Sequence, residues 1–320
     1  MSPLMSPEGL PLGWVQIWWA VLGLFVGSFL NVAIHRYGRE GETISKPRRS
    51  RCPECKTTLT WKENIPLLSW TLQRGRCRSC GWSIPLRYPL VEGLTAVLWW
   101  LAASQWDPSQ EWLREASLCG VRSVVLAGLV VATFVDFDCF EIPDGVSIGG
   151  MVLAPVASFL VPALHDHTRL ALLFSPDQMP PATRLGALTA CLAGMAAGGG
   201  ILWAIGWVGS RLYGRDAMGF GDVKLLAAGG GIIGPGGVLW ALMIASLVAS
   251  LVGIGNLLRY AFLLRARVAA RKRRQSLGRT LQVARVAGRY VPFGPYLALG
   301  IGIVLLYWKD VEGLLRYGLL

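Results

Sequence analysis

The stretch Gly219-Phe220-Gly221-Asp222 opens an apolar segment that contains no other acidic residue up to Gly234. A carboxylate at the edge of a membrane segment is costly and therefore indicates a function. A second aspartate, Asp136, ends another long apolar run. Two carboxylates in one low-dielectric site can share a proton and activate a water molecule, as in aspartic proteases. We therefore expect Asp136 and Asp222 to form a catalytic pair.

The composition is too apolar for a soluble domain. Of the 320 residues, 53% are hydrophobic and 16% are charged, and the mean hydropathy is +0.47. These values, with several runs long enough to cross a bilayer, predict an all-α polytopic membrane protein. The net charge of +12 is clustered, which in a membrane protein indicates topology and contact with anionic lipid of the inner leaflet, so we expect no nucleic-acid partner. We also expect no cleavable signal peptide.

About eight transmembrane helices are predicted, and the basic loops between them set their orientation. The basic-loop rule puts the N-terminus outside and residues 35–88 and 259–290 in the cytoplasm. The loop 259–290 contains ten Lys or Arg and no acid, and within it residues 262–286 fit a basic amphipathic helix on the inner leaflet. The predicted helices are 13–34, 89–103, 116–135, 146–164, 185–208, 223–234, 238–258 and 293–307.

The sixth of these segments, residues 223–234, is too short to cross the membrane. Twelve residues make ~18 Å of helix, whereas the apolar core of a bilayer is ~30 Å thick. If the turn at Gly234-Pro235-Gly236-Gly237 reaches the outer face, Asp222 lies well below the inner surface. Charge at that depth is tolerated in a water-filled crevice, which is where we expect the aspartate.

Three units follow from this layout. Residues 1–34 form the outer N-terminus and the first transmembrane helix. Residues 35–88 form a small cytoplasmic domain with four cysteines. Residues 89–320 form a transmembrane catalytic domain that includes the basic loop 259–290.

The four cysteines of the small domain predict a structural metal site. The pairs Cys52-Pro53-Glu54-Cys55 and Cys77-Arg78-Ser79-Cys80 are separated by 21 residues, which is typical of a site that binds one zinc ion through four thiolates. Four thiolates leave no open position for water, so the zinc would be structural. A domain of this size also buries little apolar surface and gains stability from a metal. The alternative is four reduced thiols in a small core.

The residues beside the two aspartates divide into supporting candidates and ordinary loop residues. Gly219 and Gly221 allow close backbone approach, so an extended substrate could lie beside Asp222. Lys224 could tune the site, and Asp144 either supports it or caps the next helix. For Asp138 and Glu141 we expect a solvated loop.

Two further features are left open by the sequence. His165 and His167 are expected in an exposed outer loop, with a metal role as the less favoured alternative. The stretch Pro292-Phe293-Gly294-Pro295-Tyr296 is either the entrance of a helix or a second wall of the active site, and the sequence alone favours the first.

Several blocks, in order along almost the whole chain, resemble the type IV prepilin peptidases, also called leader peptidase/N-methyltransferases. The basic loop 259–290 departs from the family pattern in being longer. The blocks that carry the resemblance are residues 27–36, 52–55, 61–70, 74–81, 87–92, 136–144, 218–224 and 292–298.

The resemblance implies a GxGD-type aspartic peptidase of the bacterial inner membrane, with Asp136 and Asp222 as its catalytic residues. Such an enzyme cuts the short basic leader of prepilins and pseudopilins after a glycine, on the cytoplasmic side, for type IV pili and type II secretion. Many members then methylate the new N-terminal amine with S-adenosylmethionine. The family links this step with the cytoplasmic domain, in which Glu63, Gly75 and Glu92 are candidates.

Two other functions stay open at this point. The chain could be a peptidase without methyltransferase activity, because no clear glycine-rich signature for S-adenosylmethionine is present. It could also be a non-catalytic membrane scaffold of a pilus or secretion machine, in which the zinc domain docks a partner. The aspartate pair distinguishes the scaffold from the enzyme, since a scaffold would tolerate asparagine at both positions.

Overall fold

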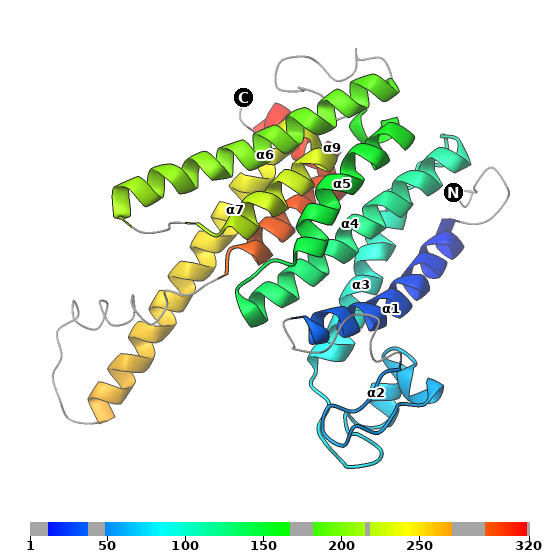
Figure 1. Cartoon of the computed structure of the whole chain (residues 1–320), viewed down its shortest axis with the longest axis vertical. Helices are drawn as coiled ribbons and strands as arrows, with labels where there is room; N and C mark the ends of the chain where they lie inside the picture. Colours follow the sequence, from blue (N-terminus) through cyan, green and yellow to red (C-terminus); the bar gives the residue numbers. More distant parts are fainter. Residues whose placement is uncertain (1–11, 38–48, 167–181, 215–217, 271–291, 319–320) are drawn as a thin grey trace.

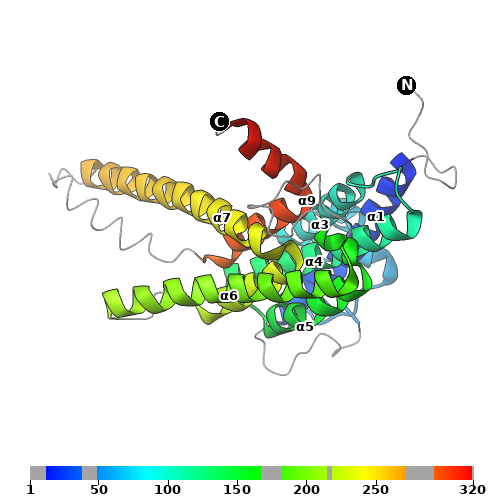
Figure 2. The same ribbon diagram turned by 90° about the horizontal axis from the view of Figure 1, so that it is seen from above.

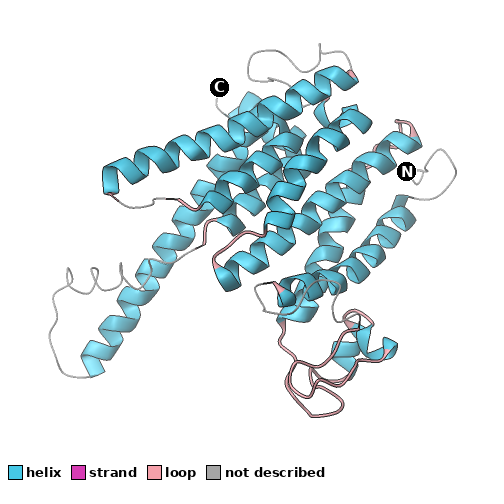
Figure 3. Cartoon of the chain, viewed as in Figure 1, coloured by secondary structure: helices cyan, strands magenta, loops and turns pink. Residues whose placement is uncertain are grey.

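The computed structural model describes residues 12–37, 49–166, 182–214, 218–270 and 292–318. Within these ranges the chain is helical, with no strand and only two isolated bridges, between Arg51 and Thr58 and between Arg76 and Ser83 (Figure 3). The all-α prediction is therefore confirmed. The helical elements are α1 (Leu12–Arg36), η1 (Trp61–Asn64), α2 (Leu68–Leu72), α3 (Arg87–Ser104), α4 (Trp112–Cys139), α5 (Asp144–Leu160), η2 (Pro162–His165), α6 (Arg184–Tyr213), α7 (Phe220–Ala270) and α9 (Gly294–Gly318).

By length and apolar composition, four helices of the described part can cross a membrane: α1, α4, α6 and residues 220–259 of α7. The helix α5 and residues 294–308 of α9 are apolar but shorter. The eight predicted segments correspond to α1, α3, α4, α5, α6, the two arms of α7, and α9. The chain is thus a polytopic helical membrane protein.

The helix α7 is interrupted where the sequence predicts a turn. Gly234 has φ 70° and ψ 172°, outside the helical region, and Pro235 follows it. A Cβ built on Gly230 would lie 2.8 Å from Cγ2 of Val238, although residues eight apart in a straight helix are separated by ~12 Å. The chain therefore bends sharply at Gly234 and forms two arms, 220–233 and 235–270.

Close glycine contacts hold the helices together. A Cβ on Gly27 of α1 would lie 2.8 Å from Cα of Glu92 on α3. Gly194 of α6 and Gly230 of α7 face each other so closely that a Cβ on Gly194 would lie 2.0 Å from the Gly230 carbonyl oxygen. Small residues at helix crossings allow such approach in membrane proteins, where close packing drives helix association.

The structure differs from the sequence prediction in two segments at the periphery of the helix bundle. The segment predicted to leave the membrane at Arg259 continues as one helix to Ala270, and this arm projects from the rest of the molecule in two views (Figures 1 and 2). Residues 262–270, the described part of the predicted amphipathic helix, are therefore helical as expected, but they continue α7 without a break. Residues 271–291, most of the predicted basic loop, lie outside the described residues. The expected exposed position of His165 is wrong: the side chain is fully buried and lies 2.9 Å from the hydroxyl of Ser158. His167 lies outside the described residues.

Candidate active site

The two aspartates of the predicted pair line one cavity of about 390 Å³. We call it the carboxylate cavity. Asp136 lies in the last turn of α4 and is 6% exposed, and Asp222 lies in the first turn of α7. Every residue expected at or beside the pair is part of the wall, namely Asp136, Asp144, Gly219, Gly221, Asp222 and Lys224.

The end of α4 places Asp136 at the cavity. The helix does not stop at residue 135 but continues to Cys139, and it closes at Phe140 in a left-handed conformation (φ 55°), whose N–H donates to the Asp136 carbonyl oxygen at 3.0 Å. The buried side chain of Ile142 then fills the corner before α5 begins. The loop expectation is wrong for Asp138, which lies on α4; its side chain is exposed, as expected, and pairs with Arg87 of α3 at 2.6 Å. For Glu141 the expectation of an exposed loop is confirmed, and this residue also lines the cavity.

A residue that sequence reasoning did not assign also reaches Asp136. The backbone N–H of Gly294, the first residue of α9, donates to Asp136 Oδ2 at 3.0 Å. The stretch Pro292 to Tyr296 therefore forms a helix entrance and also contacts the site. In the sequence, Gly294 lies between Pro292 and Pro295 at the start of an apolar segment. This pattern is also typical of an ordinary helix start, so the sequence alone did not assign Gly294 to the site.

Asp144 and Lys224 form an ion pair across the cavity. Asp144 is the first residue of α5, after Pro143, and its carboxylate binds the Lys224 ammonium on α7. An acidic residue in the first turn also complements the positive end of the helix dipole. The pair therefore connects the helix that follows Asp136 to the helix that carries Asp222.

The four cysteines of the predicted zinc domain lie together. Their Sγ atoms are all within 4.8 Å of one another, with 3.9 Å between Cys52 and Cys80 and 4.0 Å between Cys55 and Cys77. In a tetrahedral site with Zn–S bonds of ~2.3 Å, the sulfur atoms lie ~3.8 Å apart. The donor set and its spacing therefore fit one four-coordinate metal ion.

Two family models match the sequence. The model of the "Bacterial Peptidase A24 N-terminal domain" matches residues 21–106, and that of the "Type IV leader peptidase family" matches residues 123–254. An Aeromonas hydrophila protein named prepilin leader peptidase/N-methyltransferase is 32% identical over 316 residues, which cover 91% of this chain and 89% of that protein. The chain belongs to the type IV leader peptidase family.

Other members of the type IV leader peptidase family are similarly related. A Myxococcus xanthus protein with the same name is 37% identical over 239 residues, covering 74% of this chain and 62% of that protein. An Escherichia coli protein named type 4 prepilin-like proteins leader peptide-processing enzyme is 32% identical over 301 residues, covering 89% and 91%. No solved structure matches the chain significantly. Family membership and the four long apolar helices together indicate a multi-pass protein of the inner membrane.

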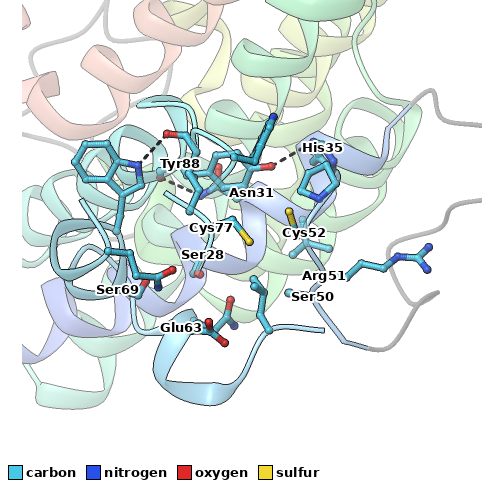
Figure 4. Close-up of a pocket in the computed structure, with 18 of the residues that line it drawn as sticks. Ser28, Asn31, His35, Ser50, Arg51, Cys52, Glu63, Ser69, Cys77 and Tyr88 are labelled. Carbon is cyan, nitrogen blue, oxygen red and sulfur yellow. Dashed lines mark hydrogen bonds between the residues drawn. The ribbon is translucent and has the colours of Figure 1, made fainter. Parts of the chain in front are cut away.

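The described residues between α1 and α3 (49–86), which contain the four clustered cysteines, are called the cysteine domain below. A second cavity lies between the end of α1 and this cysteine domain (Figure 4). We call it the domain cavity. Two of the three methyltransferase candidates, Glu63 and Glu92, line it. Glu63 also accepts bonds from the N–H and hydroxyl of Thr60 at 2.8 and 2.7 Å, which lower the pKa of its carboxyl group below the ordinary value. Glu92 is buried and accepts the Leu67 N–H at 2.8 Å.

The third candidate, Gly75, is not part of that wall. Its φ of 67° lies in the left-handed region, and a Cβ there would lie 2.9 Å from the ring of Trp70. Trp70 does line the domain cavity and donates its indole N–H to the Ile84 carbonyl at 3.1 Å. Gly75 therefore allows a left-handed backbone conformation and leaves space for the Trp70 ring, which packs against it.

The two cavities are neighbours at the end of α1. His35 and Arg36 line the domain cavity, and the next residue, Tyr37, lines the carboxylate cavity. The ion pair of Arg87 with Asp138 joins the same regions, because α3 follows the cysteine domain and α4 carries Asp136. The two sites therefore open at the same end of the helix bundle.

Proposed function

We propose that this protein is a prepilin leader peptidase that also methylates its product. It removes the short basic leader of prepilins and pseudopilins after a glycine, with Asp136 and Asp222 as the catalytic pair. The observation that carries the proposal is the carboxylate cavity, where two aspartates from different apolar helices line one space at the helix ends. Family membership supplies the substrate class, because the related proteins are named for prepilin processing.

The reaction uses the two carboxylates as base and acid. The ionised aspartate takes a proton from a water molecule, which attacks the scissile carbonyl carbon. The protonated aspartate donates its proton to the carbonyl oxygen, which gives a tetrahedral diol. When the carbon–nitrogen bond breaks, the first aspartate passes the proton it took from water to the leaving amine, and a diol hydroxyl returns a proton to the second aspartate. Because the two groups are coupled, the pair titrates as a unit. Gly219 and Gly221 leave room for the substrate backbone beside Asp222.

The charged residues at the cavity fit a basic leader. Glu141 and Asp144 stand on its wall and are exposed. Carboxylates at the rim attract a cationic substrate through an interaction that weakens with salt. Asp144 already pairs with Lys224, so Glu141 is the stronger candidate for a direct contact with the leader.

Methylation of the new amine would take place in the domain cavity, with S-adenosylmethionine as the methyl donor. When bound, this molecule supplies an electrophilic methyl group on a cationic sulfur. The wall suits such a ligand, since Glu63 and Glu92 offer carboxyl groups and Trp70 and Tyr88 offer aromatic surface. Because Tyr37 of the carboxylate cavity directly follows His35 and Arg36 of the domain cavity, a newly cleaved N-terminus would form close to the methyl donor.

The cysteine domain would hold one structural zinc ion through Cys52, Cys55, Cys77 and Cys80. We further propose the three-unit division 1–34, 35–88 and 89–320. The N-terminus lies outside, and the domain and both cavities face the cytoplasm, in accord with the basic loops. The basic segment 259–290 contacts anionic lipid of the inner leaflet.

A peptidase without methyltransferase activity is the second candidate. It is favoured by one observation: both acidic residues of the domain cavity already have structural partners, Thr60 for Glu63 and the Leu67 N–H for Glu92. In that case the domain cavity would be a structural gap, and the domain would only support α1 and α3.

The test is cleavage of a prepilin in detergent micelles, read by mass spectrometry. Wild type is compared with Asp222→Asn, with and without S-adenosylmethionine. Loss of the leader with wild type alone supports the peptidase, and an added methyl group on the product supports the second activity. Cleavage without methylation would leave the peptidase and remove the methyltransferase. No cleavage of several prepilins by folded wild type would favour the scaffold.

A further inference from the structure

The carboxylate of Asp136 is held by a helix far away in the sequence. Its Oδ2 accepts the N–H of Gly294 at 3.0 Å, although the two residues are 158 positions apart. The bond is buried, so it is not exchanged for a bond to bulk water. A buried N–H at the start of a helix needs an acceptor because it has no partner inside the helix. Each group of this contact therefore satisfies the other.

The contact has no room for a side chain at position 294 unless its neighbours move. A Cβ built on Gly294 would lie 2.5 Å from Asp136 Oδ2 and 3.1 Å from Cδ1 of Ile142. A Cβ atom essentially never comes within 3.0 Å of a heavy atom of a residue that is distant in the chain. Both atoms that it would meet are far ends of side chains, which can rotate away. An alanine would therefore be accommodated by displacing the carboxylate, and the helix could keep its place.

The same corner also positions the first turn of α7. A Cβ on Gly221 would lie 3.2 Å from Cβ of Ile142. Ile142 is thus in close contact with two glycines, one beside Asp222 and one bonded to Asp136. A single buried side chain sets how near α7 and α9 come to the end of α4.

We propose that Gly294 is a positioning residue for the aspartate pair. Its N–H fixes Oδ2 of Asp136 and leaves Oδ1 for proton transfer with water, and its missing side chain lets α9 come this close. The proposal rests on the proposed peptidase function. It gives the stretch Pro292 to Tyr296 a role in the reaction besides starting a helix.

The experiment compares wild type, Gly294→Ala and Gly302→Ala in detergent micelles. Gly302 is the matched control, because it lies on the same helix and its added Cβ would be 3.6 Å from Leu126, an ordinary contact. The kcat and KM for prepilin cleavage and the thermal unfolding temperature are measured for each. Gly294→Ala is expected to lower kcat by about 100-fold, the cost of a small misplacement of a catalytic group. KM and the unfolding temperature stay near wild type, and Gly302→Ala keeps wild-type kcat.

The outcomes separate positioning from packing. A kcat of Gly294→Ala within about threefold of wild type would overturn the proposal, since a displaced group costs far more. An equal loss in Gly302→Ala would also overturn it, because the effect would then be general to α9. If Gly294→Ala folds poorly, the double variant with Ile142→Ala removes the contact of the new methyl group with Ile142 and leaves its closer contact with Oδ2 of Asp136. That variant should therefore fold and still show the loss of kcat, and full recovery would count against the role of Gly294. Failure of wild type to cleave would instead overturn the proposed function.

Discussion

The carboxylate cavity and the cysteine domain are built in opposite ways. The cysteine domain brings its four sulfur atoms together from residues 52–80 through two similar turns. In each turn the N–H of the residue after the second cysteine donates to the carbonyl of the first, from Lys56 to Cys52 and from Gly81 to Cys77. The carboxylate cavity gathers residues from the ends of α4, α5 and α7, and α9 adds a bond from Gly294.

The difference shows what stabilises each region. The cysteine domain has few buried side chains, and large apolar residues such as Trp61 and Leu72 are mostly exposed. A domain with so small a core gains much of its stability when it binds a metal ion, so we expect the fold of this one to depend on a metal. The aspartates instead stand on helices whose apolar residues form the main core. A change at one site should therefore leave the other intact.

The largest expected effect is loss of cleavage when either aspartate becomes asparagine. Asp136→Asn and Asp222→Asn each remove a group that must carry or accept a proton, so cleavage should fall by more than about 10³-fold. The double variant should lose little more than either single variant, because the two groups act as a unit. Mass spectrometry of the prepilin measures the loss, and methylation of a pre-cleaved peptide is the control.

Near-normal turnover by either variant would show that the pair is wrong. If a variant that still folds loses methylation as well as cleavage, the two sites are not independent of each other.

The next effect is on the cysteine domain. Cys77→Ser, or a strong chelator, should remove the metal and unfold the region between α1 and α3, because metal binding and folding are coupled. Limited proteolysis should then cut within residues 49–86, and methylation should fall more steeply than cleavage. Bound metal is measured by elemental analysis. A domain that stays resistant to protease with no metal bound would favour four reduced thiols in a small core.

The features that could be predicted from the sequence depend on short stretches of the chain. The cysteine cluster follows from local spacing, and the bend at Gly234 follows from a Gly-Pro-Gly-Gly turn. The membrane helices follow from apolar runs. That both aspartates line one cavity followed from their similar places at segment ends, because alternating segments return to the same side.

What could not be predicted depends on contacts between distant residues. The bond from Gly294 to Asp136 has no local pattern, because it exists only when α9 packs beside α4. The helix α4 continues past residue 135 to Cys139, although Asp, Phe and Cys are not strong helix formers, and Arg87 of α3 pairs with Asp138 in this last turn. His165 is buried because Ser158, seven residues earlier, supplies a partner. None of these is visible in composition.

A smaller effect tests whether Gly75 is a structural residue. Gly75→Ala must place a Cβ at a left-handed φ, which costs about 1–2 kcal/mol, and also against the rigid Trp70 ring. Gly81→Ala is the matched control, since Gly81 has a similar φ of 73° with nothing within 4 Å. Gly75→Ala should therefore destabilise the domain more than Gly81→Ala, as measured by protease resistance in urea. A change in the KM for S-adenosylmethionine without loss of stability would instead assign Gly75 to the binding site.

The ion pair between Asp144 and Lys224 should contribute still less. Asp144 is 64% exposed, and pairs of this kind are worth about 0–1 kcal/mol. A double-mutant cycle with Asp144→Asn and Lys224→Met measures their coupling in cleavage. We expect each single variant to lower kcat/KM by about threefold and the double variant to show partial non-additivity. A loss near that of the Asp222→Asn variant would move Asp144 or Lys224 into the catalytic machinery.

An effect of similar size distinguishes the two cysteine turns from each other. Lys56 occupies the position of Gly81 and has a φ of 58°, where a non-glycine residue costs about 1–2 kcal/mol. Lys56→Gly removes this strain but adds about 0.5–1 kcal/mol of entropy cost on folding. The difference predicts a net stabilisation of about 0.5–1 kcal/mol, measured by protease resistance in urea. Lys56→Ala keeps the strained backbone and should give no gain, so an equal gain from both variants would show that the lysine charge, rather than its backbone, opposes folding.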